Sequence, residues 1–221
     1  QLAAGIAHEI NTPLASISAD AEMIRKIINS SETLHLDKLE IIRELNTLDI
    51  EASKRISDIV KSLKRYIRLD EAELQTADIN SEIDLTLKLA ASEIKKNTKI
   101  IKKYGLLPGV KGRINMLNQV FMNLIVNACQ SIDADKQEGI IQIETSSDDK
   151  NIIIKIKDNG CGIPKENKNK IFESGFTSKK AGIGTGLGLS ISKKIIEMHK
   201  GCISFTSEEN EGSEFVIMLP V

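Results

Sequence analysis

The chain lacks most features of a secreted, membrane-spanning or zinc-binding protein. Its 221 residues include no tryptophan, 3% aromatic residues and only three cysteines, Cys129, Cys161 and Cys202, which lie far apart. Because this spacing fits neither a zinc site nor a disulfide framework, we interpret the thiols as reduced. No apolar run approaches the roughly 20 residues that a membrane-spanning helix needs, and no signal peptide is visible.

The chain also lacks an excess of charge of either sign. Its 30 lysines and arginines nearly balance its 31 aspartates and glutamates, for a net charge of -1. A chain without an overall field does not attract nucleic acid or a membrane surface as a whole, so we expect neither as a partner. The sequence opens at Gln1 instead of a methionine. We therefore expect a cytoplasmic fragment whose upstream sensor domain, with or without a membrane anchor, is missing.

The first 68 residues contain two apolar stripes with steps of three and four residues. The stripes consist of Ile6, Ile10, Leu14, Ile17, Ala21, Ile24 and Ile28, and of Ile41, Leu45, Leu48, Ala52, Ile56, Ile59, Leu63 and Ile67. This spacing predicts two long helices, and the polar segment 29–33 predicts the loop between them. Two stripes cannot close a core alone, so we expect a homodimer in which two antiparallel hairpins form a four-helix bundle.

The pattern changes after an acidic segment near residue 70. We expect a first domain at 1–68, a linker at 69–76 and a second domain at 77–221. In the second domain the patterns predict helices at 80–96, 113–133 and about 186–200, strands at 98–104, 140–145 and 152–157, and two closing strands. These elements predict an α/β sandwich in which helices cover one face of a mixed or antiparallel sheet. The loop at 158–185 exceeds the usual ~12–15 residues, which indicates a functional or mobile segment.

An imidazole and a carboxylate, His8 and Glu9, stand side by side in the first predicted helix. His8 lies two residues after Ile6 and two before Ile10, so we expect it off the buried stripe. A neutral imidazole has a nitrogen lone pair that can attack a phosphoryl group, and Glu9 can accept a hydrogen bond from the other nitrogen. Taken alone, an ordinary surface histidine is the more common interpretation. The other motifs of the chain favour the interpretation of His8 as a nucleophile.

Five further residues are suited to a nucleotide. Asn123 and Asn127 are four apart and share one helix face, and their amide oxygens suit a Mg²⁺ ion that bridges phosphates. Asp158 ends a predicted strand, where its carboxylate can accept the exocyclic amine of adenine. Gly160 and Gly162 let the backbone approach the ring. A tight turn without a ligand is the alternative interpretation.

A glycine-rich segment at 182–189 leads into the last predicted helix. Glycine backbone at a helix N-terminus presents N–H groups to phosphates. The segment is neither a Walker loop, since no Gly-Lys-Ser/Thr follows, nor a dinucleotide loop, since no strand closely precedes it. Lys179 and Lys180 lie within plausible reach of a terminal phosphate. Phe172 and Phe176 flank the loop and either cover the nucleotide or anchor a lid.

Together these segments resemble the five boxes of the sensor histidine kinases of two-component signalling, in the family's order. The H-, N-, G1, F- and G2 boxes correspond to Gly5–Leu14, Asn118–Ile132, Asp158–Pro164, Ile171–Lys179 and Gly182–Leu189. Each box is weak evidence alone, whereas five in order over nearly the whole chain are very specific.

The resemblance implies a dimeric phosphoacceptor hairpin followed by a gyrase/Hsp90-like (Bergerat) ATP-binding domain, with ATP and Mg²⁺ as cofactors. The implied function is that of a protein histidine kinase, a transferase in signal transduction. It phosphorylates itself on His8 and passes the phosphoryl group to an aspartate in the receiver domain of a response regulator. A phosphatase activity toward that regulator is also implied. An ATP-driven clamp and a pseudokinase scaffold stay open as alternatives.

The resemblance also implies roles for individual residues. His8 is the nucleophile, Glu9 its base and orienting partner, and Thr12 positions water for the phosphatase reaction. Asn123 and Asn127 bind Mg²⁺ and phosphates. The implied nucleotide site comprises Asn123, Asn127, Asp158, Gly160, Gly162, Phe172, Thr177, Lys179, Gly184, Thr185, Gly186, Leu187, Gly188 and Leu189.

Two positions depart from the patterns of related families. Many histidine kinases have a basic residue where this chain has Gln130, and Lys179 is our candidate for the missing phosphate contact. Gyrase-like ATPases place a hydrolytic glutamate where this chain has Asn123. The absence of that carboxylate favours transfer to His8 over hydrolysis, which discriminates a kinase from an ATP-driven clamp.

Overall fold

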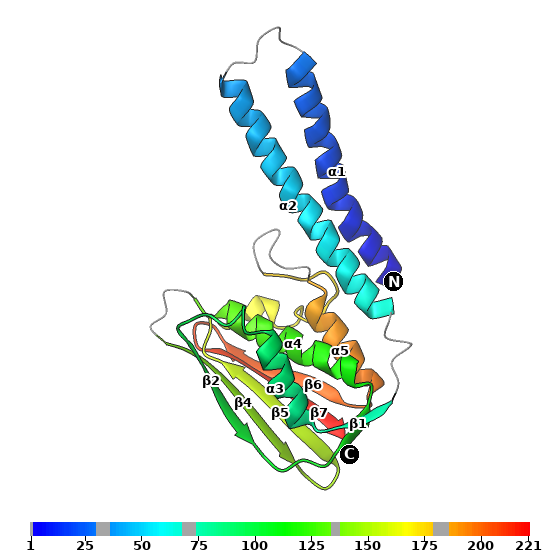
Figure 1. The fold of residues 1–221 in the computed structure, drawn as a ribbon, viewed down its shortest axis with the longest axis vertical. Coiled ribbons are helices and arrows are strands. Elements are labelled where there is room, and N and C mark those ends of the chain that lie inside the picture. The colour runs from blue at the N-terminus through cyan, green and yellow to red at the C-terminus, as the bar shows by residue number, and fades with distance from the viewer. Residues whose placement is uncertain (1, 30–35, 68–73, 134–137, 179–185) are drawn as a thin grey trace. The chain divides into compact units, whose positions relative to one another are not determined.

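The computed structural model describes residues 2–29, 36–67, 74–133, 138–178 and 186–221 (Figure 1). They belong to two units, each treated below by itself. One comprises 1–67 and 174–187, and the other 68–173 and 188–221. In parts of the helical hairpin only the backbone is described, and the side chains of residues 2–9, 36, 54, 55 and 57–67 lie outside the description.

The first unit contains a hairpin of two long helices, as predicted. Helix α1 (Leu2–Asn29) packs along α2 (Leu36–Ile67) (Figure 1). Pro13 lies buried inside α1. None of the described helices is both long and apolar enough to cross a membrane.

In neither helix does the whole width of the predicted apolar stripe face the other helix. In α2, Leu45 is partly shielded together with Ile42 and Asp49, whereas Ile41 and Leu48 are 43% and 48% exposed. The same happens in α1, where Leu14 and Ile28 are each 49% exposed. Because an apolar stripe of this kind is wider than one helix contact, each helix packs one edge of its stripe inside the hairpin and leaves the other edge exposed.

The second unit is built on a five-stranded sheet with the order β2-β4-β5-β7-β6. Its strands are β2 (Thr98–Tyr104), β4 (Gly139–Ser147), β5 (Asn151–Asp158), β6 (Cys202–Glu208) and β7 (Gly212–Pro220). β2 is parallel to β4 and every other pairing is antiparallel, so of the two predicted alternatives the mixed sheet is confirmed.

Helices cover one face of this sheet (Figure 1). They are α3 (Ile79–Leu89), α4 (Ile114–Ser131) and α5 (Gly188–Met198). The strands alternate with period two, so Ile143, Ile154 and Ile217 enter the core, where they lie completely buried with Phe121 of α4.

The other face of the sheet carries several charged side chains among apolar ones. Glu144 lies opposite Lys155 across the β4–β5 pair, and the Nζ atom of Lys103 lies 3.0 Å from its Oε1 atom. Alternating charges across neighbouring strands suit a solvated face.

Two features of the second unit differ from the sequence prediction. A ribbon of β1 (Gln75–Ala77) and β3 (Val110–Gly112) was missed, because three residues are too few to show a period. The helix predicted at 80–96 ends at Leu89. The residues predicted as its last turns are not helical. Among them, Lys95 donates a hydrogen bond to the carbonyl of Ile132, the residue that follows the last residue of α4.

Replacing Phe121 with alanine should destabilise this core. Phe121 is completely buried, so Phe121→Ala should lower the free energy of unfolding by about 3–5 kcal/mol through lost burial and a cavity. Urea denaturation followed by circular dichroism measures the change. Leu106→Ala is the control, because Leu106 is 97% exposed and its loss should change stability by at most about 0.5 kcal/mol. Equal effects of the two variants would contradict this account of the core.

Candidate active site

The predicted adenine-binding residue, Asp158, lies at the end of β5 and is only 4% exposed. Side chains alternate along a strand, so Asp158 shares the helix-covered face with Ile152, Ile154 and Ile156. The carboxylate therefore points into the domain beneath α4.

A buried carboxylate needs hydrogen-bond donors. The Oδ1 atom of Asp158 accepts from the hydroxyl of Ser131, at 2.9 Å, and from the backbone N–H of Gly160, at 2.8 Å. Ser131 is the last residue of α4. Its hydroxyl also lies 2.8 Å from the carbonyl of Ala128, but a hydroxyl has one proton, and an ionised carboxylate is the stronger acceptor. Ser131 thus fixes the orientation of Asp158.

The two glycines after Asp158 lie too close to other parts of the fold to have a side chain. A Cβ atom on Gly160 would lie 2.1 Å from the Ser131 hydroxyl oxygen. Gly162 has a φ of +69°, and a Cβ there would lie 2.0 Å from the carbonyl oxygen of Glu208. We predicted these glycines from the needs of a nucleotide, and the structure adds a packing reason for each.

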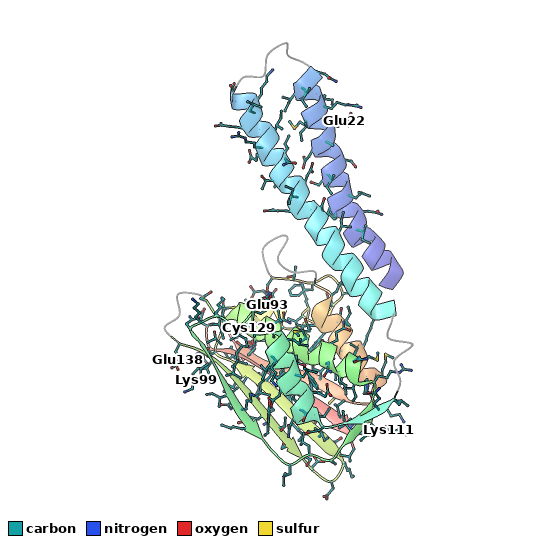
Figure 2. The ribbon with its side chains drawn as sticks, viewed as in Figure 1. Glu22, Glu93, Lys99, Lys111, Cys129 and Glu138 are labelled. Carbon is teal, nitrogen blue, oxygen red and sulfur yellow. The ribbon has the colours of Figure 1, made fainter. Side chains whose placement is uncertain are left out.

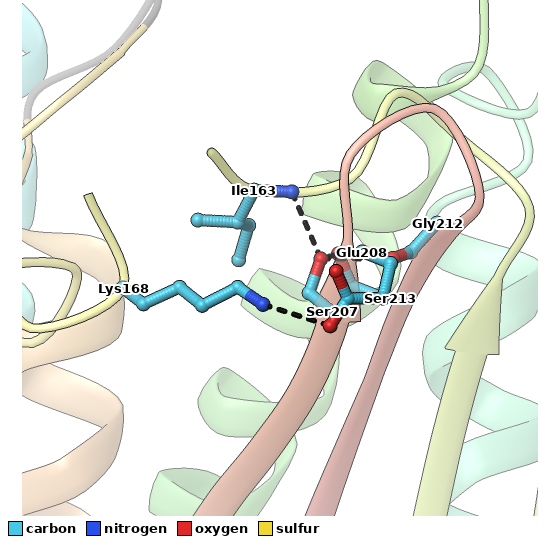
Figure 3. A network of polar contacts seen from close by, with 6 residues as sticks. All are labelled: Ile163, Lys168, Ser207, Glu208, Gly212 and Ser213. Carbon is cyan, nitrogen blue, oxygen red and sulfur yellow. Dashed lines mark hydrogen bonds and ion pairs between the residues drawn. The ribbon is translucent and has the colours of Figure 1, made fainter. Parts of the chain in front are cut away.

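The loop that contains these glycines is hydrogen-bonded to the turn between β6 and β7, residues 208–212, and to the strand residues beside it (Figure 3). Ile163 donates its N–H to the Ser207 hydroxyl at 2.8 Å, and Asn210 donates its N–H to the Cys161 carbonyl at 2.7 Å. Lys168 forms an ion pair of 3.1 Å with Glu208. Ser207 was not predicted from the sequence, because one serine in a strand forms no pattern of its own.

The asparagine pair lies on α4, and both side chains are partly exposed. The Nδ2 atom of Asn123 donates to the Ser192 hydroxyl of α5 at 2.9 Å. Its Oδ1 atom faces the first residue of that helix, because a Cβ on Gly188 would lie 2.2 Å from it. The amide is therefore fixed in one orientation, with its oxygen beside the N-terminus of α5.

Phe172 is packed against the edge of the sheet. Its ring lies edge-on to Phe205, with centroids 5.9 Å apart, and Phe205 stacks on Phe215. The Nζ atom of Lys193 lies 5.6 Å from the Phe172 centroid. Of the two roles predicted for Phe172, this packing favours that of an anchor for the following segment.

The remaining predicted residues fall into two groups. Thr12 and Gln130 are exposed, Thr177 and Leu189 are partly buried, and Leu187 is buried. Gly186 has a φ of +65° and accepts a hydrogen bond from the N–H of Gly175. The side chains of His8 and Glu9, and residues Lys179, Gly184 and Thr185, lie outside the described part of the structure.

Two family models match this chain. Residues 112–221 match the model described as histidine kinase-, DNA gyrase B- and HSP90-like ATPase, and residues 1–72 match the His Kinase A (phospho-acceptor) domain.

Curated relatives agree with both matches. The histidine kinase AtoS of Escherichia coli K12 is 31% identical over 224 residues, which cover 100% of this chain and 34% of AtoS. The sensor histidine kinase ZraS of the same strain is 31% identical, over 100% of this chain and 45% of ZraS. The chain thus spans between a third and a half of the length of these relatives.

Solved structures share the fold. The catalytic domain of histidine kinase ThkA is 32% identical, with a TM-score of 0.59 over 67% of this chain and 95% of that domain. A structure of ThkA in complex with response regulator protein TrrA is 27% identical, with a TM-score of 0.62 over 99% of this chain and 60% of ThkA.

The mixed sheet with helices on one face belongs to a domain that matches the ATPases of the gyrase B and Hsp90 kind. Joined to the phosphoacceptor match, this domain identifies the family. The chain belongs to the sensor histidine kinases of two-component signalling.

The three thiols should differ in reactivity. Cys129 of α4, labelled in Figure 2, is buried, and this burial raises its pKa to about 11, whereas Cys161 and Cys202 are exposed. The Cys129 thiol should therefore stay protonated and unreactive near pH ~8. A colorimetric thiol titration should count two reactive thiols in the native protein and three after unfolding.

A Cys129→Ala variant is the control for this titration. It should keep two reactive thiols when native and lose one of the three when unfolded. Three rapidly reacting thiols in the native wild-type protein would contradict the burial of Cys129.

Proposed function

We propose that this chain is the catalytic core of a sensor kinase that phosphorylates itself on His8 with ATP and passes the phosphoryl group to an aspartate of a response regulator. The proposal rests on one observation. The phosphoacceptor match contains His8, and the ATPase match in the same chain contains the buried Asp158.

The arrangement around Asp158 supports adenine as the base. A carboxylate that is held in place by Ser131 and Gly160 can accept the exocyclic amine of adenine. Guanine has a carbonyl oxygen at the corresponding ring position, which a carboxylate repels. ATP is therefore preferred over GTP.

The asparagines of α4 fit a phosphate-bound Mg²⁺. Amide oxygens are hard neutral ligands, and Ser192 already fixes the amide of Asn123. We assign Asn123 and Asn127 to hold this ion. When bound, Mg²⁺ neutralises part of the phosphate charge.

The chemical step is an in-line displacement. One ring nitrogen of His8 attacks the γ-phosphorus, the N–P bond forms, and the P–O bond to ADP breaks. Glu9 accepts a hydrogen bond from the other ring nitrogen and stabilises the charge that develops on the ring. Positioning supplies most of the rate.

The next acceptor is an aspartate carboxylate of a receiver domain. Its oxygen attacks the phosphorus, the P–O bond forms, and the N–P bond to His8 breaks. The relative ThkA, whose structure contains a response regulator, supports this class of partner. Thr12, which is exposed on α1, is our candidate for positioning the water that hydrolyses the phosphoaspartate of the regulator in the phosphatase reaction.

A second copy of the chain covers the exposed stripe of the hairpin. Leu14, Ala21 and Ile28 follow one another at intervals of seven residues along α1, as do Ile41 and Leu48 along α2, and all five are exposed within one chain. Exposed apolar residues at heptad spacing are typical of a helical bundle seam. We therefore propose a homodimer through residues 1–68, with a linker at 69–76, a catalytic domain at 77–221, and a cytoplasmic location where ATP is present.

Replacing the nucleophile should abolish autophosphorylation. His8→Ala should show no incorporation of radiolabel from ATP labelled on the γ-phosphoryl group, and its affinity for ATP should stay unchanged. The wild-type label should be lost in acid and survive alkali, as expected of phosphohistidine. His35→Ala is the control and should label normally.

Two outcomes would contradict the kinase assignment. Acid-labile label in His8→Ala would place the acceptor elsewhere. Steady hydrolysis of ATP that is indifferent to the loss of His8 would instead support an ATP-driven clamp.

A charge on the exposed stripe should dissociate the dimer. Leu48→Glu places a carboxylate where we expect an apolar contact with the second copy, so analytical ultracentrifugation should show half of the wild-type mass. Asn46→Glu adds the same charge to an exposed position of α2 away from the stripe and should stay dimeric. A monomeric wild-type protein, or a dimeric Leu48→Glu, would contradict the proposed seam.

A further inference from the structure

A buried serine, Ser207, connects the Asp158–Ile163 loop to β6, the edge strand of the sheet. Ser207 lies near the end of β6, is 7% exposed, and belongs to neither the phosphoacceptor site nor the predicted nucleotide site. Figure 3 shows its contacts with the loop and with β7.

The hydroxyl of Ser207 uses its full hydrogen-bonding capacity. It donates its one proton to the carbonyl of Gly212 at 2.8 Å and accepts the N–H of Ile163 at 2.8 Å. Its oxygen also lies 2.9 Å from the Ser213 hydroxyl. Because the Ser207 proton is already used, Ser213 must be the donor of this third bond.

These bonds fix one end of the loop that begins at Asp158. Ile163 lies five residues after the carboxylate, and its N–H has Ser207 as a partner that comes from outside the loop. Asn210, at a φ of 65°, adds a second attachment through the carbonyl of Cys161. The contact is close, because a Cβ on Gly212 would lie 2.1 Å from the carbonyl oxygen of Asp158.

The opposite side of the loop is attached to α4. The N–H of Cys161 donates to the carbonyl of Ser131 at 2.9 Å, and Ser131 also holds the Asp158 carboxylate. The loop thus lies between the end of α4 and the β6–β7 turn. Because the loop is attached on both sides, we expect that the loss of a bond to the β6–β7 turn moves the loop relative to α4. The Asp158 carboxylate at the start of the loop would move with it.

We propose that Ser207 is a positioning residue for the nucleotide: it holds the Asp158–Ile163 loop against the β6–β7 turn and thereby sets the affinity for the adenine end of ATP. This role presupposes the ATP binding proposed above. It concerns the base and not the phosphates, because the loop contains Asp158 and the phosphate-binding asparagines lie on α4.

The test compares binding of ADP and of tripolyphosphate by isothermal titration calorimetry, well below the unfolding temperature of each variant. Ser207→Ala leaves the Ile163 N–H without its partner. The Kd for ADP should rise about three- to ten-fold, the range expected for one lost hydrogen bond. The affinity for tripolyphosphate should not change.

Three further variants separate positioning from general stability. Ser207→Thr retains the hydroxyl and should restore the affinity for ADP. Ser204→Ala changes an exposed serine of the same strand and should have no effect. Should Ser207→Ala fail to fold, Ser207→Cys retains a weaker hydrogen-bonding group and should show the same selective loss of ADP affinity.

Each contradictory result has a distinct meaning. A lower unfolding temperature with an unchanged Kd for ADP would overturn the positioning role and leave the proposed function intact. An equal loss of ADP and tripolyphosphate affinity would also overturn it, since the effect would not be confined to the base. A wild-type protein that binds neither ADP nor ATP would overturn the proposed function itself.

Discussion

The second unit depends on the burial of one carboxylate. A carboxylate removed from water loses several kcal/mol of hydration unless donors replace that water, and Asp158 is almost completely buried. Two of its donors are the Ser131 hydroxyl at the end of α4 and the N–H of Gly160 two residues along the chain. The same oxygen atom therefore connects the end of α4 to the start of the loop.

Helix α4 serves the core and the site together. Its Phe121, Leu124 and Ile125 are buried against the sheet, while Asn123 and Asn127 lie on its partly exposed side. The bond between Asn123 and Ser192 ties this helix to α5. A packed helix cannot rotate without losing core contacts, so the orientation of the asparagines follows from the burial of their neighbours.

The sequence predicts some of this site and omits the rest for physical reasons. Strand alternation from Ile152 to Ile156 places Asp158 on the buried face, and the spacing of Asn123 and Asn127 places both on one side of a helix. The attachments by Ser131 and Ser207 were missed, because each joins segments distant in sequence and neither serine belongs to a local pattern. His199 also joins segments that are distant in sequence, since its ring accepts a hydrogen bond from the N–H of Arg113, 86 residues away. Local periodicity has no information about such pairs.

In the function that we propose, the asparagine at position 123 bears on whether ATP is hydrolysed or used for transfer. Hydrolysis needs a base that removes a proton from water, and a carboxylate can act so, whereas an amide has no basic lone pair. The amide nitrogen of Asn123 is already donating to Ser192, and its oxygen lies beside Gly188. A side chain that can hold an ion but cannot activate water leaves the γ-phosphoryl group intact until a stronger nucleophile arrives. An imidazole on a separate helical hairpin meets that requirement, which is why a site of this composition is suited to a kinase.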